Sequence, residues 1–159
     1  MILNPLITII IPTYNMAALL KDAINSVLSQ TYQNWELLII DNFSTDNTIE
    51  VINNFEDTRI KTFQLNNNGS IAISRNYGIK KALGDWIAFL DSDDIWYSNR
   101  LTTVLNNLNL KDLPDLITTN EVLKNVDTGY SKKLLYGRKI VDNLYESLLF
   151  YGNLFSPSS

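Results

Sequence analysis

Short apolar runs rich in β-branched residues alternate along this chain with segments of helical periodicity. The first run, residues 6–11, is continuously apolar apart from Thr8, which is typical of a strand buried on both faces. Further strands are predicted over Glu36–Ile40, Arg59–Leu65 and Trp86–Leu90. Because strand-helix units of this kind form right-handed crossovers, we expect an α/β fold, a mostly parallel sheet with helices on both faces.

Four helices are expected among and after these strands. The second is predicted to begin at Ser44 as its N-cap, with Asp46 in its first turn, and Gly84 fits the C-terminal cap of the third. The side chains that define the helical stripes are Leu20, Ala23, Ile24, Val27 and Leu28, then Ile49, Ile52 and Phe55, then Ala72, Asn76, Ile79, Ala82 and Leu83, and finally Leu101, Val104, Leu105 and Leu108.

The last fifty residues follow a different pattern. A strand is predicted over residues 115–119, and residues 121–136 resemble a hairpin that turns around Asp127-Thr128-Gly129. A final helix is expected from the spacing of Val141, Leu144, Leu148 and Tyr151. The length of 159 residues fits one domain, residues 1–159.

Composition removes several chemistries. The chain has no cysteine and no histidine, which excludes thiolate nucleophiles, imidazole bases and the usual zinc sites. A net charge of −4 argues against nucleic acid as a partner. Every apolar stretch is far shorter than the ~20 residues of a transmembrane helix, so we expect no membrane span. The expected location is the cytoplasm, either free or peripheral to the inner face of the membrane.

Polar residues follow three of the predicted strands, at Pro12-Thr13-Tyr14-Asn15, Asp41-Asn42-Phe43-Ser44 and Asp91-Ser92-Asp93-Asp94. Ligands of open parallel sheets bind at the carboxyl ends of the strands, so these segments are expected to form one site. If a nucleotide binds there, Tyr14 offers an aromatic wall and Asp41 or Asn42 a hydrogen-bond partner for the base.

The third segment concentrates three acids in four residues. Such clustering repels itself unless a cation neutralises it, and carboxylate oxygens suit Mg²⁺ or Mn²⁺ completed by substrate phosphates. The structural alternative is a solvated turn in which Asp93 or Asp94 caps the next helix. The chain has neither the glycine-rich dinucleotide fingerprint nor a Walker loop, which disfavours Rossmann oxidoreductases and P-loop NTPases.

Five motifs in unbroken order resemble those of family-2 glycosyltransferases, nucleotide-sugar enzymes with the GT-A fold. The resemblance covers residues 5–110. Residues 111–159 match the family only loosely and would form part of its acceptor side. The motifs are Pro12-Thr13-Tyr14-Asn15, Ser29-Gln30-Thr31-Tyr32, Glu36 to Asp46, Ser74-Arg75-Asn76-Tyr77-Gly78 and Leu90-Asp91-Ser92-Asp93-Asp94.

The resemblance implies residue roles. Asp93 would be the principal ligand of Mn²⁺ or Mg²⁺, Asp91 would lie near the ribose and the metal, and Arg75 beside the nucleotide or its phosphates, with a surface or salt-bridge role as the alternative. The residues implied to bind the nucleotide sugar are Pro12, Thr13, Tyr14, Asn15, Asp41, Asn42, Arg75, Asp91 and Ser92.

Two positions depart from the family pattern. The family usually has a second acid where Asn42 stands, and this acid commonly meets the uracil ring. The side-chain oxygen of Asn42 can accept from the uracil N3–H, while its amide also offers a donor. Phe43 replaces a common small residue, so the choice between uridine and another nucleotide stays open.

Trp96 is a candidate wall of the sugar or acceptor pocket.

The resemblance implies an inverting glycosyltransferase that moves a sugar from a nucleoside diphosphate sugar, expected to be UDP-linked, to a glycan or glycoconjugate acceptor in polysaccharide or cell-surface biosynthesis. The general base is expected beyond residue 159, which would make this chain the donor-binding part of a larger enzyme. A non-catalytic nucleotide-sugar-binding module stays open. So does a Mg²⁺-dependent haloacid-dehalogenase-like phosphatase, although that class needs an aspartate after the first strand.

Overall fold

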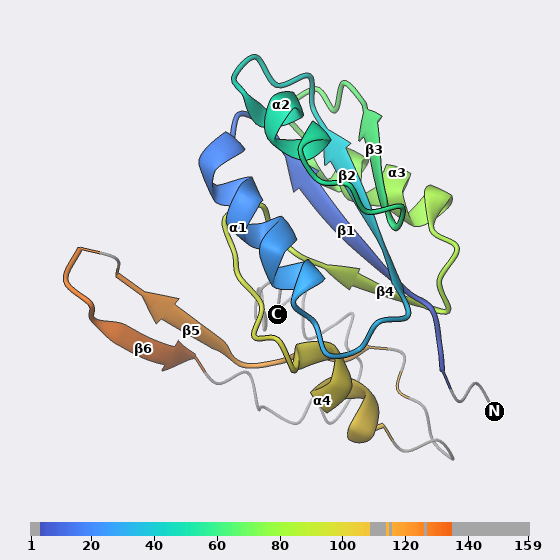
Figure 1. Ribbon diagram of the computed structural model, residues 1–159, viewed down its shortest axis with the longest axis vertical. Coiled ribbons are helices and arrows are strands. Elements are labelled where there is room, and N and C mark those ends of the chain that lie inside the picture. Colours follow the sequence, from blue (N-terminus) through green and yellow to red (C-terminus); the bar gives the residue numbers. More distant parts are fainter. Residues whose placement is uncertain (1–3, 109–113, 115, 126, 135–159) are drawn as a thin grey trace, which may run out of the picture. The chain divides into compact units, whose positions relative to one another are not determined.

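Four parallel strands form the central sheet of the protein (Figure 1). The computed structural model describes residues 4–108, 114, 116–125 and 127–134. The strand order is β3-β2-β1-β4, and each neighbouring pair is parallel, which confirms the predicted α/β sheet. The elements are β1 Ile7–Thr13, α1 Ala17–Leu28, β2 Trp35–Asp41, α2 Thr48–Asn53, β3 Ile60–Gln64, α3 Ile71–Lys81, β4 Trp86–Phe89 and α4 Arg100–Asn106.

The strand order fixes where a ligand can bind. From β1 the chain adds β2 and then β3 on one side, and it then crosses back to place β4 on the other side of β1. The side of the sheet on which strands are added therefore switches between β1 and β4. In open α/β sheets the binding crevice lies outside the carboxyl ends of the strands at such a switch point.

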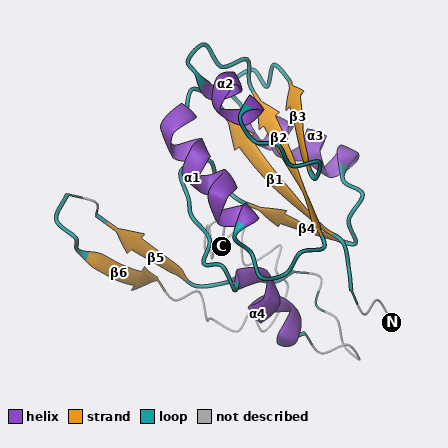
Figure 2. Ribbon diagram, in the orientation of Figure 1, coloured by secondary structure: helices purple, strands orange, loops and turns teal. Residues whose placement is uncertain are grey.

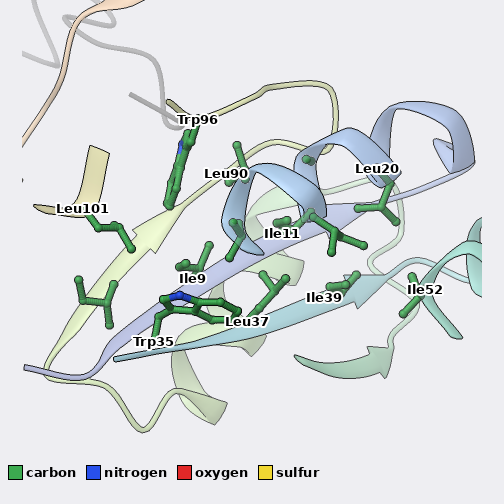
Figure 3. Packing of buried hydrophobic residues seen from close by; sticks show 14 residues of the cluster. Ile9, Ile11, Leu20, Trp35, Leu37, Ile39, Ile52, Leu90, Trp96 and Leu101 are labelled. Carbon is green, nitrogen blue, oxygen red and sulfur yellow. The ribbon is translucent and has the colours of Figure 1, made fainter. Parts of the chain in front are cut away.

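Helices cover both faces of the sheet, as predicted. Ile9 and Ile11 of β1 belong to a cluster that includes the buried side chains of α1 together with Trp96 and Leu101 (Figure 3). Ile10 belongs to a second cluster with Leu38 and Ile40, and Tyr77 of α3 packs against it. In Figure 2, α1 crosses the near face of the sheet and α3 lies behind it. No helix among the described residues is long and apolar enough to cross a membrane.

The described residues from 114 onward form a separate compact unit. Strands β5 Glu121–Lys124 and β6 Ser131–Leu134 pair antiparallel, which confirms the predicted hairpin. The strand predicted over residues 115–119 is wrong for residues 116–119, which have no regular secondary structure and pair with no strand among the described residues. Residue 115 and the predicted final helix at Val141, Leu144, Leu148 and Tyr151 lie outside the described residues.

The predicted start of the second helix is wrong. Helix α2 begins at Thr48 with Asn47 as its cap residue, four residues after Ser44. The Ser44 hydroxyl is used elsewhere, because it donates to the Asp41 carboxylate (2.5 Å). The Asp46 carboxylate lies before the helix and accepts from the Thr48 backbone N–H (3.0 Å).

The third predicted helix is present as α3, but the side chains named for its stripe are mostly exposed. The buried residues of α3 are Ser74 and Gly78, whereas Ile79 and Leu83 are exposed. A Cβ atom at Gly78 would lie 2.7 Å from the Ile10 Cγ2 atom, so the helix packs on the sheet through its small residues. Close approach to β1 therefore decides which side of α3 is buried, in place of the helix's own apolar pattern.

Gly84 lies against the backbone of β1 and does not cap α3, whose C-cap residue is Ala82. A Cβ atom at Gly84 would lie 2.6 Å from the Thr8 backbone N and 2.7 Å from the Leu6 carbonyl oxygen. Backbone atoms of a buried strand cannot move aside at low cost. Glycine is required at this position by space.

We predict that Gly84→Ala lowers the free energy of unfolding by about 1–3 kcal/mol, the usual cost of overpacking. Chemical denaturation measures this change. Ala72→Ser is the matched control, because Ala72 is exposed on α3 and the added atom meets solvent. An equal effect of the two substitutions would contradict the steric account.

Glu36 of β2 bonds to β1, to β3 and to the segment that follows α3, at the amino-terminal side of the sheet. Its carboxylate accepts from the Thr8 hydroxyl (2.8 Å), the Leu83 backbone N–H (2.7 Å) and the Lys61 ammonium (2.9 Å). Burial raises the pKa of Glu36, but the bonds from Lys61, Leu83 and Thr8 outweigh burial and leave this pKa below its ordinary value.

A depressed pKa in the folded state means that Glu36 stabilises the protein above its unfolded pKa of about 4.3, and that this contribution is lost as the pH falls through the folded pKa. We predict that Glu36→Gln is less stable than the wild type near pH 7 and loses less stability between about pH 5 and pH 3. Denaturant titrations across this range measure both slopes. Parallel stability curves for the two proteins would show that Glu36 does not contribute to the acid sensitivity.

Candidate functional site

The carboxyl ends of β1 and β2 are joined into one structure by hydrogen bonds. The Asn42 backbone N–H donates to the Thr13 carbonyl (3.0 Å), and the Asn15 backbone N–H donates to the Ser44 hydroxyl (2.9 Å). The Asn15 side-chain oxygen accepts from the Thr45 N–H (2.7 Å). The first two polar segments predicted from the sequence therefore meet at one edge.

Backbone strain accompanies this junction. Asn15 has a φ of 51° and Phe43 a φ of 54°. Asparagine tolerates the left-handed region, but an aromatic residue adopts it at a cost that the surrounding structure must offset. The Phe43 side chain is 53% exposed, and Tyr14 on the neighbouring strand end is 51% exposed. Two aromatic side chains thus stand open to solvent at this edge.

Residues at the end of β1 differ in their access to solvent. Pro12 and Thr13 are buried, and the Thr13 Oγ1 atom has no hydrogen-bond partner among the residues that the structure describes. Tyr14 and Asn15 are exposed. A buried, unpaired hydroxyl beside exposed polar and aromatic side chains leaves hydrogen-bonding capacity at the strand end.

Asp41 organises the loop after β2. Its carboxylate is fully buried and accepts from the Ser44 backbone N–H (3.2 Å), the Ser44 hydroxyl (2.5 Å) and the Gln64 side-chain amide (3.2 Å). These bonds come from the loop itself and from β3. Asp41 therefore holds the segment from Asn42 to Ser44 in place.

Asn42 links β2 to the loop that precedes α3. Its side-chain oxygen accepts from the Asn67 backbone N–H (2.9 Å), and the Asn67 amide donates to the Ser74 hydroxyl (3.0 Å). Asn67 and Ser74 are both buried. The sequence prediction assigned no role to Asn67 or Ser74, although Ser74 begins one of the five motifs.

Arg75 and Asp91 form an ion pair at the carboxyl end of β4, with 2.5 Å between Arg75 Nη2 and Asp91 Oδ1. The two side chains are only 16% and 26% exposed. The Arg75 Nε atom is buried and has no hydrogen-bond partner in the described part of the chain, and the guanidinium lies 5.7 Å from the centre of the Phe89 ring. Arg75 thus forms an ion pair with the acidic segment after β4, which the sequence analysis identified. Its Nε–H group can still donate a hydrogen bond.

The acidic segment forms a tight turn in which the Asp94 backbone N–H donates to the Asp91 carbonyl (3.1 Å). Ser92 is buried, whereas Asp93 is exposed and has no hydrogen bond or ion pair among the described residues. The capping alternative is wrong, because the next helix begins at Arg100 with Asn99 as its cap residue.

The donor set fits a divalent cation that also binds a substrate. No group of three or more acidic, histidine or cysteine side chains gathers in the part of the chain that the structure describes. Within the described ranges the Asp93 carboxylate has no partner, and the Asp91 carboxylate, which pairs with Arg75, belongs to the residue two positions earlier. Mg²⁺ and Mn²⁺ accept such sparse carboxylate sets when waters and substrate phosphates supply the other ligands.

Trp96 does not wall a pocket: it is 5% exposed and belongs to the core cluster (Figure 3). The segment that follows the acidic turn is held by Gln30, which is 1% exposed. Its side chain donates to the Tyr97 carbonyl (2.8 Å) and accepts from the Leu101 N–H (3.1 Å). The motif Ser29-Gln30-Thr31-Tyr32 signalled this residue, but only the fold shows what it holds.

The model of glycosyl transferase family 2 matches residues 8–151. The chain is 40% identical over 145 residues to the UDP-Glc:alpha-D-GlcNAc-diphosphoundecaprenol beta-1,3-glucosyltransferase WfgD of Escherichia coli, covering 78% of this chain and 57% of that protein. It is 39% identical over 100 residues to the putative teichuronic acid biosynthesis glycosyltransferase TuaG of Bacillus subtilis, covering 62% and 40%. The chain thus spans about half the length of these relatives.

Solved structures share the fold. S. aureus TarS 1-349 in complex with UDP has a TM-score of 0.60 at 29% identity, with 63% of this chain and 31% of that chain covered. The mannosyltransferase PcManGT from Pyrobaculum calidifontis, solved with GDP-Man and Mn²⁺, has a TM-score of 0.60 at 24% identity and covers 64% and 32%. These structures share the fold, and the family model matched over residues 8–151 shows that the chain belongs to glycosyl transferase family 2.

Proposed function

We propose that this chain carries the donor site of a glycosyltransferase that moves a sugar from a UDP-sugar to a glycan or glycoconjugate acceptor in polysaccharide or cell-surface assembly. The observation that carries the proposal is the set of polar groups at the carboxyl ends of β1, β2 and β4, beside the switch point of the sheet. The uridine part is supported by the Escherichia coli relative, whose name specifies UDP-Glc, and by the UDP complex of TarS.

The proposed division of roles follows the geometry. Tyr14 and Asn42 would contact the nucleoside. Arg75 pairs with Asp91, and its remaining N–H donors would bind the diphosphate. Asp93, with Asp91, would hold Mn²⁺ or Mg²⁺. Pro12, Thr13, Asn15, Asp41 and Ser92 complete the proposed site.

Charge explains why this constellation suits sugar transfer. Breaking the bond between a sugar and a nucleoside diphosphate leaves negative charge on the two phosphates, and a bound divalent cation supplies compensating charge there. Arg75 contributes a fixed positive charge from the protein at the same edge. We propose direct displacement with inversion at the anomeric carbon, for which the acceptor hydroxyl needs a carboxylate base.

We predict that UDP with Mn²⁺ raises the melting temperature of this protein by roughly 5–10 °C at 100 times the dissociation constant, since such binding is worth about 2.7 kcal/mol. EDTA should reduce this rise. Differential scanning fluorimetry with and without the metal measures both effects. No response to UDP under either condition would contradict the proposed donor.

Asp93→Asn should remove the metal-dependent part of UDP affinity without lowering the stability of the unliganded protein, because this side chain is exposed and makes no contact that folding needs. Isothermal titration with and without Mn²⁺ separates the two parts. Asp22→Asn removes the same charge from an exposed position on α1 and should leave UDP binding unchanged. An unchanged metal dependence in the Asp93 variant would exclude this residue as a ligand.

Gln30→Leu should weaken Mn²⁺-dependent UDP binding more than metal-free UDP binding, because it releases the segment that follows the acidic turn. It should also cost about 1–3 kcal/mol of stability, since the Leu101 N–H loses its acceptor. Asn25→Leu replaces an exposed amide on α1, the helix that ends just before Gln30, and is the control. Equal losses with and without metal would assign Gln30 a purely structural role.

A further inference from the structure

The segment that contains the hairpin β5–β6 carries a charge opposite to that of the rest of the chain. Residues 121–139 hold five of the thirteen basic residues and only two of the seventeen acidic residues, which gives this segment a net charge of +3. The rest of the chain has a net charge of −7. Such a charge asymmetry within one chain indicates a negatively charged partner for the basic segment.

The lysines of the hairpin are exposed. Lys124 lies on β5, and Lys132 and Lys133 lie on β6. None of the three forms an ion pair with a described residue. Their positive charge is therefore available to a partner.

Each face of the hairpin (Figure 1) combines a lysine with an exposed apolar side chain. Val122 lies directly opposite Lys133, and Leu123 lies directly opposite Lys132. Opposed residues of a strand pair point to the same face, whereas successive residues of a strand point to opposite faces. Val122 is 43% exposed, Leu123 is 55% exposed, and Tyr130, which directly precedes β6, is 66% exposed.

The hairpin lacks the packing that normally stabilises two strands. None of the described residues from 114 onward belongs to either hydrophobic cluster of the protein. A two-stranded hairpin is marginally stable in water unless it packs against an apolar surface. A partner that takes up the exposed apolar side chains would supply this surface.

The two-faced pattern favours a membrane over a protein as this partner. A protein surface covers one face of a hairpin, which would leave either Val122 or Leu123 in water. The layer between lipid headgroups and acyl chains surrounds both faces, so both side chains can leave water together. Lysine stems can then reach back to anionic headgroups, and tyrosine is enriched at this depth.

We propose that the hairpin β5–β6 docks this protein on the surface of an anionic lipid membrane. Its three exposed lysines bind the lipid phosphates, and Val122, Leu123 and Tyr130 enter the interfacial layer. The rest of the chain is acidic and is repelled by the same surface, so the attraction is confined to the basic segment. This inference does not depend on the proposed donor site.

The triple variant Lys124→Gln, Lys132→Gln, Lys133→Gln tests the proposal in the whole protein. Co-sedimentation measures binding to vesicles of phosphatidylcholine and phosphatidylglycerol in equal parts, and to vesicles of phosphatidylcholine alone. The wild type should prefer the anionic vesicles. The triple variant should bind them about a hundredfold more weakly, because each lysine near such a surface contributes to the attraction.

The triple variant Lys21→Gln, Lys80→Gln, Lys81→Gln is the matched control. It removes the same charge from exposed positions on α1 and α3. This control should retain most of the affinity for anionic vesicles, and far-UV circular dichroism verifies that both variants fold. Equal losses in the two variants would show that net charge alone governs binding and would overturn the proposal.

Leu123→Ser tests whether the hairpin enters the interfacial layer. Raised salt screens the contribution of the lysines, so the binding that persists there reports the apolar contacts. Leu123→Ser should lose this persistent binding. Leu83→Ser is the control, since Leu83 is 71% exposed and lies outside the hairpin. Equal binding of Leu123→Ser and the wild type at raised salt would overturn the insertion of the hairpin.

Other partners give different results in the same proteins. A dimer in sedimentation velocity that the hairpin variant dissociates, without vesicle binding, would overturn the proposal in favour of a second copy of this chain. Hairpin-dependent binding to a DNA duplex, again without vesicle binding, would overturn it in favour of nucleic acid. A wild type that binds UDP but no vesicle would overturn this inference and leave the proposed function standing.

Discussion

The parallel pairing of β1 with β2 on one side and β4 on the other is the constraint on which the rest of the structure depends. All seven residues of β1 are buried, so its position is fixed by packing on both faces and by hydrogen bonds along both edges. Because β1 pairs in parallel with both neighbours, its carboxyl end must lie beside those of β2 and β4. The site is a consequence of this topology.

Within that frame, buried hydrogen bonds give the site its shape and leave a few groups unused. Asp41 and Gln30 have their polar atoms engaged by backbone and neighbouring side chains, so they hold the loops that follow β2 and β4. Among the described residues, the groups of this edge without a partner include the Asp93 carboxylate, the Thr13 hydroxyl, the Arg75 Nε atom and the Asn42 amide nitrogen. Full engagement of the supporting residues is what keeps the unused groups in position to meet a ligand.

Much of the fold was predictable because buried parallel strands have a strong sequence signal. The runs around Ile9, Leu38 and Ala88 lack alternation, and the structure contains strands there. The polar strand ends were equally visible, since polar residues that directly follow such strands have few structural uses. The same reasoning located Asp91 and Asp93 without knowledge of any contact.

The errors arose where tertiary contacts override local pattern. Gly78 lets α3 approach Ile10, and this contact turns Ile79 and Leu83 to solvent. Ser44 has the composition of a helix cap, but Asp41 takes its hydroxyl and the helix begins later. No single-sequence pattern indicates that Asn67 would orient the Asn42 amide, because that contact joins loops 25 residues apart.

The central claim is that one edge of the sheet, at the carboxyl ends of β1, β2 and β4, binds the donor nucleotide. An assigned ¹H–¹⁵N spectrum of this protein titrated with UDP and Mg²⁺ tests it most directly. The account predicts amide shift changes concentrated at residues 12–15, 41–44, 67–75 and 91–94. Changes concentrated instead around Glu36 and Gly84, at the opposite edge, would contradict it.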